Sequence, residues 1–282
     1  MIAIDGILVR DDDAKISVLD RGFLYGDGLF EILRTWNRVA VDLDLHLDRL
    51  LASAIELHIA ADRVAITRAV TDVIAATEGE QRLRIIVTRG QGGITARFAD
   101  VRGGHTIVIA ESLTPPPPRA TEEVAQVSLA VVDYPLAQRA GHAHKTLSYL
   151  DHLIAKQLAA EAGADEALRC APDGSVVEGA TSNIFILIHG IVVTPPVAGI
   201  LPGITRGHVL ACCGELGLSC QERGIARAEL AAADEIFITS AVRGIVAVTR
   251  LDGRSHGNGV GVVTKELALA YAERMRRATM PA

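Results

Sequence analysis

Hydrophobic positions recur with two different periods in the first part of the chain. Between Leu43 and Ile59 the apolar residues fall at helical spacing, which predicts an amphipathic helix. The segments 29–35, 83–88 and 106–110 are instead short apolar runs rich in β-branched residues, which predict strands. Residues 1–10 contain a strand pair that turns at Asp5–Gly6.

The second half of the chain continues with the same two kinds of pattern. An apolar run from Ile184 to Ile188 turns at His189–Gly190 and returns as Ile191 to Thr194, which predicts a hairpin. Further strands are predicted at 124–132, 166–170, 235–239 and 245–250, and helices at 147–162, 204–216, 228–233 and 263–277. Strands and helices mix without strict alternation, so we expect α+β domains and not a doubly wound sheet.

Four consecutive prolines at 115–118 separate the two halves. Such a run favours a stiff polyproline II segment and enters neither a helix nor a central strand. We therefore expect a small domain at 1–114, a Pro-rich linker at 115–121 and a larger domain at 122–282.

Composition narrows the function classes. The chain has 282 residues, 49% of them hydrophobic and 22% charged, with a net charge of −6 and 4% aromatic residues. A basic patch with stacking rings is absent, which argues against nucleic acid. No apolar run is long enough to span a bilayer, and the acidic N-terminus lacks a signal-peptide core. The four cysteines form no CxxC pair. We expect a cytoplasmic protein without a metal site or a membrane partner.

The stretch from Glu178 to Arg206 carries the candidate chemistry. A carboxylate, Glu178, precedes the predicted hairpin, and a glycine-punctuated loop at 199–203 leads into a helix that begins near Ile204. Free backbone N–H groups at the positive end of a helix suit a phosphate. A carboxylate and an anion cradle together imply a ligand with a cationic and an anionic pole. An ordinary hairpin with a buried glutamate would explain each piece separately, but not their joint order.

This order of residues resembles the signature of the class IV (fold type IV) pyridoxal-phosphate aminotransferases. That family includes branched-chain and D-amino-acid aminotransferases and 4-amino-4-deoxychorismate lyase. The matching pattern is Glu178-x-small-x-x-Asn183-aliphatic-Phe, then Val192-x-Thr194, then Leu201-x-Gly203-Ile-x-Arg206. The resemblance extends over nearly the whole chain. It implies the α+β fold of fold type IV, in which a small α/β domain and a larger barrel-like domain hold pyridoxal 5′-phosphate between them, and it implies a homodimer.

Lys145 and Glu178 correspond to the two central residues of the family. Lys145 matches the Schiff-base lysine, and we expect it at the start of the helix 147–162. A lysine that forms an imine must be neutral part of the time, which burial or a nearby cation favours. Glu178 matches the partner of the pyridine nitrogen, which a carboxylate keeps protonated so that the ring accepts electrons. Taken alone, Lys145 would be a surface charge and Glu178 half of a surface ion pair.

Other cofactor contacts follow from the same resemblance. Arg49, in a His46-x-x-Arg49-Leu pattern, matches the phosphate-binding arginine, since its planar fork binds phosphate oxygens bidentately. The alternative is a helix-surface arginine, and we assign His46 no catalytic role. The remaining implied cofactor contacts are Asn183, Leu201 against the ring, the backbone N–H groups of Ile204 and Thr205 at the phosphate, and the second phosphate turn at Ser240 and Ala241. Many relatives carry a hydroxyl in place of Ala241, so only its backbone contact is expected here.

Substrate recognition rests on two residues. Phe30 matches an aromatic residue that lines the pocket in relatives, and Arg97 follows a glycine-rich loop from which it could bind a substrate carboxylate. The D-amino-acid enzymes have an arginine and a histidine two residues apart at this point. Here Arg97 is followed by Phe98 and Ala99, which argues against D-amino-acid specificity.

The leading hypothesis is an aminotransferase that moves an amino group from an amino acid or amine to a 2-oxo acid through a Lys145 Schiff base. The alternative is 4-amino-4-deoxychorismate lyase, which forms 4-aminobenzoate and pyruvate. The segments TRGQGG, KTLSY and SAVRGIVAV are closer to the lyase branch, and aminotransferases more often have a Glu in place of Gly244. A non-catalytic protein that only carries the cofactor is a third class, against which the intact set of Lys145, Glu178 and Arg49 argues.

Overall fold

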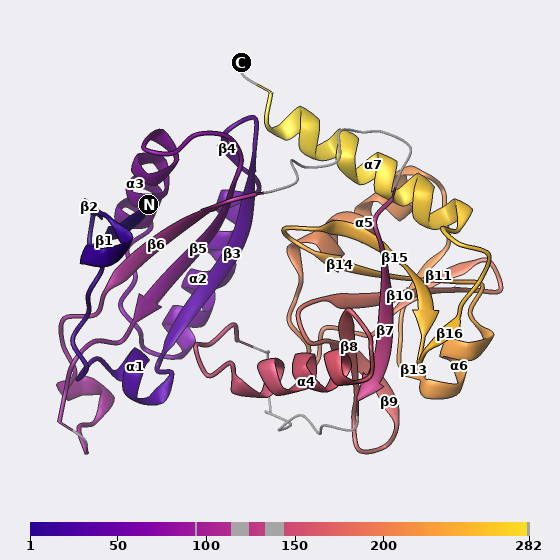
Figure 1. Cartoon of the computed structure of the whole chain (residues 1–282), viewed down its shortest axis with the longest axis horizontal. Helices are drawn as coiled ribbons and strands as arrows, with labels where there is room; N and C mark the ends of the chain where they lie inside the picture. Colours follow the sequence, from indigo (N-terminus) through magenta and orange to yellow (C-terminus); the bar gives the residue numbers. More distant parts are fainter. Residues whose placement is uncertain (94, 114–123, 133–143, 281–282) are drawn as a thin grey trace. The chain divides into compact units, whose positions relative to one another are not determined.

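The computed structural model describes residues 1–93, 95–113, 124–132 and 144–280. They form two compact units (Figure 1). The first unit contains residues 1–113, 144–149 and 275–280, and the second contains 124–132 and 150–274. The expected linker 115–121 lies outside the described residues. The segment 144–149, with Lys145, and residues 275–280 thus belong to the first unit. The expected domain bounds stay a prediction.

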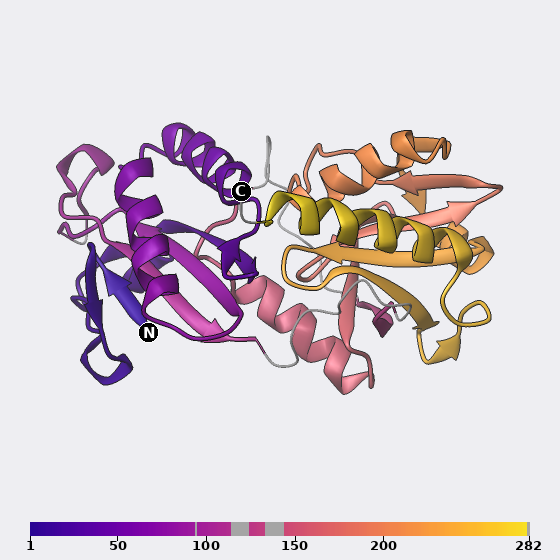
Figure 2. The same ribbon diagram turned by 90° about the horizontal axis from the view of Figure 1, so that it is seen from above.

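The first unit is built on a six-stranded antiparallel sheet with the strand order β2-β1-β6-β5-β3-β4. Its strands are β1 (Ile2–Ile4), β2 (Ile7–Val9), β3 (Gly28–Trp36), β4 (Val39–Ala40), β5 (Gln81–Thr88) and β6 (Thr106–Ser112). The helices α2 (Leu43–Glu56) and α3 (Arg63–Ala75) pack on one face of this sheet (Figures 1 and 2). Two 3-10 turns, at Asp11–Asp13 and Phe98–Asp100, lie in its loops.

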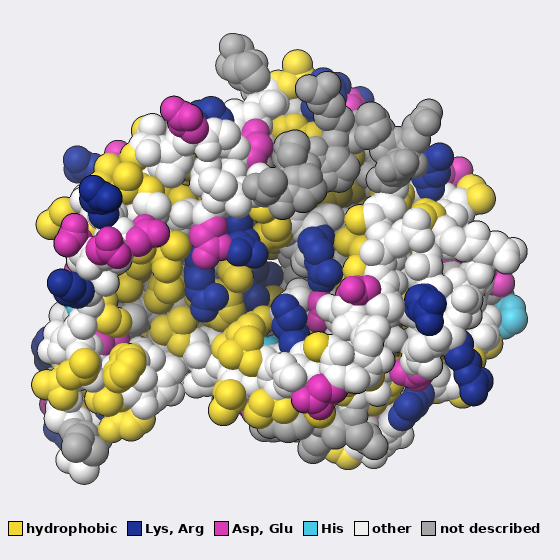
Figure 3. Space-filling view, in the orientation of Figure 1, with side chains coloured by type: hydrophobic (Ala, Val, Ile, Leu, Met, Phe, Trp, Pro, Cys, Tyr) yellow, Lys and Arg dark blue, Asp and Glu magenta, His cyan; other side chains and the backbone are white. Residues whose placement is uncertain are grey.

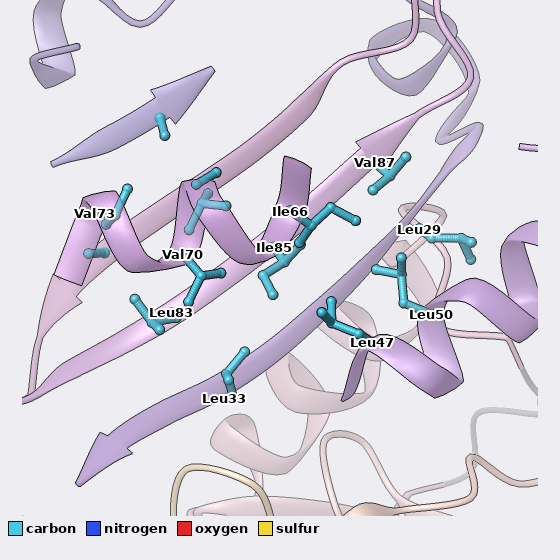
Figure 4. Packing of buried hydrophobic residues seen from close by; sticks show 14 of the residues in the cluster. Leu29, Leu33, Leu47, Leu50, Ile66, Val70, Val73, Leu83, Ile85 and Val87 are labelled. Carbon is cyan, nitrogen blue, oxygen red and sulfur yellow. The ribbon is translucent and has the colours of Figure 1, made fainter. Parts of the chain in front are cut away.

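The core of the first unit follows from the alternation of side chains along its strands (Figure 4). Leu29 and Leu33 of β3, together with Leu83 and Ile85 of β5, point toward the helices and are buried. The helices contribute their own apolar face, which includes Leu47, Leu50, Ile66, Val70 and Val73. Because alternate residues of a strand face opposite sides, Glu31 points toward the helices, whereas Phe30 points to the other face.

A short helix, α1 (Arg21–Tyr25), lies within the glycine-rich loop 17–28, where the sequence predicts only a loop. The Asp20 carboxylate caps it, accepting from the Gly22 N–H at 2.7 Å and from the Thr88 hydroxyl at 2.8 Å. The helix ends at Gly26, whose φ of 66° favours glycine, and a Cβ there would lie 2.6 Å from the Ser148 hydroxyl oxygen. The turn chemistry of Asp20 and Gly26 therefore fixes this loop.

The segment that carries Lys145 runs along β3 and is not helical. The Phe30 N–H donates to the Lys145 carbonyl at 2.9 Å, and the Leu147 N–H donates to the Gly28 carbonyl at 3.0 Å. The following helix, α4, spans Leu150–Glu161. The expected helix start at 147 was therefore three residues early, because backbone pairing with β3 holds these residues extended.

The second unit contains a ten-stranded mixed sheet with the order β12-β11-β10-β14-β15-β7-β8-β9-β13, and β16 pairs with β15. The pairs β7–β8, β7–β15 and β11–β12 are parallel and the others are antiparallel. The strands are β7 (Gln126–Val132), β8 (Glu166–Cys170), β9 (Ser175–Gly179), β10 (Asn183–Ile188), β11 (Ile191–Thr194), β12 (Cys220–Glu222), β13 (Ile225–Ala226), β14 (Glu235–Ser240), β15 (Gly244–Leu251) and β16 (Arg254–Ser255). The predicted hairpin is β10–β11.

The sheet of the second unit curls around its own core, and its strands turn strongly from one edge to the other (Figures 1 and 2). One buried cluster joins Leu129 of β7, Val176 of β9, Ile184 of β10, Ile238 of β14 and Val246 of β15. Its helices are α4, α5 (Ile204–Glu215), α6 (Arg227–Ala232) and α7 (Val262–Ala278), of which the last four residues, 275–278, are assigned to the first unit. In the described part of the chain, no helix combines the length and the apolar character needed to cross a membrane.

Candidate active site

Lys145 lies over an aromatic pair in the first unit. Its Nζ is 4.6 Å from the centroid of the Phe30 ring and 6.0 Å from that of Tyr149. The two rings meet edge to face, with centroids 5.2 Å apart. An ammonium group is attracted to the faces of such rings. The structure therefore brings together two residues that the sequence singled out, Lys145 and Phe30.

Tyr149 and Arg84 also belong to this cluster, and the sequence predicted a role for neither of them. The Arg84 guanidinium lies 4.3 Å from the Phe30 ring centroid. Burial lowers the pKa of Arg84, against the Coulombic effects of Tyr149 and Glu111, which raise it. Tyr149 stands in the quoted segment KTLSY, so its spacing of four from Lys145 was available as a signal. Arg84 gave no signal, because it alternates along β5 like an ordinary strand residue.

Arg49 is held by a buried carboxylate on the helix-covered side of the first sheet. Its Nε donates to Glu31 Oε1 at 2.8 Å and its Nη2 to Oε2 at 2.5 Å. His46 Nδ1 lies 2.7 Å from the same Oε2. Burial alone would raise the pKa of Glu31, but the charge of Arg49 and the hydrogen bonds from His46 and Arg49 lower it to about 2. Arg49 is thus anchored within α2 and is not an ordinary surface arginine.

Glu178 in the second unit is buried and held by two donors. It lies on β9 directly opposite Arg169 of β8 in the antiparallel register. Arg169 Nη2 donates to Glu178 Oε1 at 2.9 Å, and the Leu201 N–H donates to Oε2 at 3.3 Å. Glu178 therefore contacts the backbone of the loop 199–203, which the sequence placed in the same site. Arg169 was not foreseen, although a charged residue within the apolar strand 166–170 was a usable signal.

The loop 199–203 is fixed to the start of β10. Asn183 Nδ2 donates to the Leu201 carbonyl at 3.0 Å. A Cβ at Gly203 would lie 1.9 Å from Asn183 Oδ1, so the close approach of these two residues requires a glycine. Gly203 is the N-cap of α5 and offers no side-chain cap. The first backbone N–H groups of the helix, at Ile204 and Thr205, therefore receive no hydrogen bond acceptor from a capping side chain.

The second expected phosphate turn lies beside the same strand. β14 ends at Ser240, and Thr239 of β14 pairs with Asn183 of β10. The turn after Ser240 is stabilised by Arg243, whose N–H donates to the Ser240 hydroxyl oxygen at 3.4 Å. The Arg243 guanidinium donates to the buried Glu166 at 2.8 Å. Within the second unit, Asn183 and Ser240 thus lie at neighbouring strand ends, and Ala241 follows directly.

Arg97 occupies a different environment from the other arginines. Its side chain is 84% exposed, and its Nε lies 3.0 Å from Asp100 Oδ2 in an i,i+3 ion pair. The structure places it next to the 3-10 turn Phe98–Asp100. The contacts of Arg97 thus consist of a local pair, and its expected contact with a substrate carboxylate stays a prediction.

The groups that the cofactor would need are present on this chain. A buried carboxylate, Glu178, suits a protonated ring nitrogen, and the N-terminus of α5 suits a phosphate. The Lys145 amine suits an aldehyde carbon. Each residue, considered in its own unit, fits pyridoxal phosphate.

Comparison with known proteins identifies the class. Residues 28–251 match the family described as amino-transferase class IV. The chain is 37% identical over 275 residues to a putative branched-chain-amino-acid aminotransferase of Methanocaldococcus jannaschii, covering 94% of this chain and 93% of the relative. It is 32% identical over 276 residues to a D-alanine aminotransferase of Bacillus licheniformis, covering 95% of each chain.

Solved structures agree with this result. The branched-chain aminotransferase of the archaeon Thermoproteus uzoniensis with norvaline matches with a TM-score of 0.80 and 31% identity, over 99% of this chain and 94% of that one. The 4-amino-4-deoxychorismate lyase of Pseudomonas aeruginosa matches with a TM-score of 0.82 and 29% identity, over 98% of each chain. This chain belongs to the class IV aminotransferases. The family and the fold that the sequence predicted are both confirmed.

Proposed function

We propose that this chain is a pyridoxal-phosphate-dependent aminotransferase whose amino donor is an amino acid with an apolar side chain and whose acceptor is a 2-oxo acid. The observation that carries the proposal is the position of the Lys145 amine over the aromatic pair Phe30 and Tyr149. Family membership and the similarity to branched-chain enzymes support it further. An aromatic surface beside the reacting amine favours an apolar donor side chain.

Each residue has a defined task in this proposal. When bound, pyridoxal phosphate supplies an aldehyde carbon and a ring that accepts electrons. The Lys145 amine would hold that carbon and would also move the proton that leaves the donor Cα. Glu178 holds a proton at the pyridine nitrogen. Arg49 and the backbone N–H groups of Ile204 and Thr205 bind the phosphate.

The lysine assignment has a direct test. The purified protein is expected to be yellow, and Lys145→Ala to remove both the cofactor absorbance and the activity. Borohydride reduction followed by peptide mapping is expected to place the cofactor on the peptide of Lys145. Lys156→Ala is the matched control, because Lys156 is an exposed residue of α4, and it is expected to keep the colour. A cofactor label on Lys156 or Lys265 would contradict the assignment.

The donor class is tested by the half-reaction. An amino donor alone is expected to convert the cofactor to its amine form, and a 2-oxo acid to restore the original spectrum. We expect L-leucine, L-valine or L-isoleucine to do this faster than D-alanine, because the histidine expected after Arg97 in D-amino-acid enzymes is absent. A faster response to D-alanine would reverse the choice of donor.

The lyase is the second candidate because of Gly244. This residue has a φ of 67°, and a Cβ there would lie 3.0 Å from the Tyr271 ring, so the glutamate of other aminotransferases would be strained at this position. The lyase neighbour adds weight to it. If no donor changes the spectrum while 4-amino-4-deoxychorismate yields 4-aminobenzoate and pyruvate, the lyase replaces the aminotransferase.

A homodimer is part of the proposal. Large apolar side chains are exposed in the segment 16–25, which contains α1, and Figure 3 shows hydrophobic side chains gathered there. The most exposed members are Val18, Leu19 and Phe23. Contiguous apolar surface of this kind supports an interface between subunits. Light scattering is expected to give twice the 29.9 kDa of the chain, and a monomeric active form would refute the dimer.

The cytoplasmic location stays a prediction from the sequence.

A further inference from the structure

Arg169 is a charged side chain in a fully buried position. It lies on β8 between Leu168 and Cys170, and its relative exposure is 0%. The antiparallel register sets it opposite Glu178, with Nη2 at 2.9 Å from Oε1. A guanidinium stays charged in proteins, so the strand carries a permanent positive charge into the interior of the second unit.

A contribution to folding stability does not by itself explain why this ion pair is buried. Removing two charges from water costs about as much as their attraction returns, so a buried ion pair is weak evidence for a stabilising role. An apolar residue at position 169 would lie on the same face of β8 as the buried Ala167 and would carry no such desolvation cost. The feature that distinguishes this pair is its acidic member, Glu178, to which the proposed function assigns the pyridine nitrogen.

We propose that Arg169 is a positioning residue that orients the Glu178 carboxylate and keeps it ionised, so that the shared proton stays on the pyridine nitrogen of the bound cofactor. The inference rests on the proposed role of Glu178. Arg169 holds Oε1, and the Leu201 N–H holds Oε2, so both oxygens are fixed.

The proton between Glu178 and a ring nitrogen has two possible places. It lies either on nitrogen, which gives a carboxylate and a pyridinium, or on oxygen, which gives two neutral groups. A guanidinium 2.9 Å from Oε1 stabilises the carboxylate and therefore the first arrangement. Loss of the charge moves the proton toward oxygen, with no other bond made or broken. The ring then withdraws electrons less strongly.

The test uses the holoenzyme loaded with pyridoxal phosphate that is ¹⁵N-labelled at the ring. The wild type is expected to give the nitrogen shift of a protonated pyridine. Arg169→Met removes the charge, and Arg169→Gln removes the charge while keeping an N–H donor. Both are expected to move the shift toward neutral pyridine and to lower kcat about 10- to 100-fold, the range typical of residues that orient a primary ligand, with little change in KM. Arg169→Lys is expected to restore most of the wild-type shift.

The controls separate this inference from the proposed function. Arg223→Met breaks a half-exposed ion pair of the same unit, with Glu229 at 2.7 Å, and is expected to leave the nitrogen shift unchanged. Glu178→Gln is expected to move the shift by itself, and adding Arg169→Met to it to move the shift no further. If Glu178→Gln leaves the nitrogen shift unchanged, the proposed role of Glu178 is wrong. If Glu178→Gln changes the shift but Arg169→Met and Arg169→Gln do not, only the proposed role of Arg169 is wrong.

Discussion

Two arginine–glutamate pairs, one in each unit, differ in which member is the more deeply buried one. In the first unit the glutamate is the inner member: the Glu31 side chain is 1% exposed and that of Arg49 is 14% exposed. In the second unit the arginine is the inner member: the Arg169 side chain is 0% exposed and that of Glu178 is 10% exposed. In both pairs, the outer member is the residue predicted to bind the cofactor.

The choice of buried member matches the charge that the proposed role requires of the more exposed residue. Arg49, which is proposed to bind the phosphate, is a cation, and a buried anion holds it. Glu178, which is proposed to bind the protonated ring nitrogen, is an anion, and a buried cation holds it. In each case the inner partner satisfies part of the hydrogen-bonding capacity of the outer one and fixes its direction. The family motif contains the outer residues, and the fold supplies the inner ones.

Removal of the inner glutamate is expected to have the largest effect. Glu31→Ala leaves the Arg49 guanidinium and His46 without their shared carboxylate in a largely buried place. Breaking a buried pair in this way costs about 3 to 5 kcal/mol, so the free energy of unfolding of the first unit is expected to fall by that amount. Urea unfolding of the cofactor-free protein measures it.

Asp48 provides the matched control for Glu31. It pairs with Arg63 at the surface, and such exposed pairs contribute about 0 to 1 kcal/mol. Asp48→Ala is therefore expected to have a small effect in the same assay. Equal losses for the two variants would show that burial of the Glu31 pair contributes nothing.

Acid is expected to weaken the first unit through the same glutamate. The folded state lowers the pKa of Glu31 from 4.5 to about 2, so its contribution is complete above the unfolded value. It is lost as the pH falls from about 4.5 to about 2, and it amounts to about 3 kcal/mol. Stability measured against pH in the wild type and in Glu31→Gln is expected to differ in slope across this window. Parallel curves would contradict the lowered pKa.

The sequence predicted the outer residues because they belong to a pattern with fixed spacing. Glu178, Asn183 and the start of α5 at Ile204 stand where the hairpin and the glycine loop indicated. The inner partners depend on which strand lies opposite. Arg169 and Glu178 are nine residues apart and meet through the register of β8 and β9. This register shifts between Arg169 and Cys170, and the hydrophobic pattern of the sequence did not predict that irregularity.

The conformation of the Lys145 segment also depends on a pairing that the local sequence pattern does not predict. Its apolar residues continue into a real helix, so the pattern predicted a helix from 147, but the backbone of 145–147 pairs with β3, more than a hundred residues earlier. Long-range pairing of this kind overrides local preference. The cluster of Phe30, Tyr149 and Arg84 around Lys145 is a consequence of that pairing.

Loss of the outer arginine is expected to have an intermediate effect on cofactor binding. Arg49→Ala removes a charged donor to the phosphate, which is distant from the reacting carbon. We expect the Kd of pyridoxal phosphate to rise about 10- to 100-fold, as for a lost charge-assisted hydrogen bond, with kcat at saturating cofactor almost unchanged.

Arg49→Lys is the comparison for that loss. It keeps the charge beside Glu31 but not the planar fork, and it is expected to fall between the wild type and Arg49→Ala. Fluorescence titration with the cofactor measures both variants. An unchanged Kd in Arg49→Ala would assign Arg49 to the support of Glu31 alone.

Arg97 extends the comparison to an exposed arginine and is expected to show the smallest effect. Its partner Asp100 is half-exposed and three residues away, so the pair contributes about 0 to 1 kcal/mol to folding. Arg97→Ala is therefore expected to leave the unfolding free energy within about 0.5 kcal/mol of the wild type.

If Arg97 binds the donor carboxylate as the sequence predicts, the KM for the donor rises a fewfold while kcat is retained, because such binding is shared by substrate and transition state. Asp100→Ala separates the two roles: it removes the local partner but keeps the cation, and it is expected to leave the KM unchanged. An unchanged KM for the donor in Arg97→Ala would show that Arg97 does not bind the substrate.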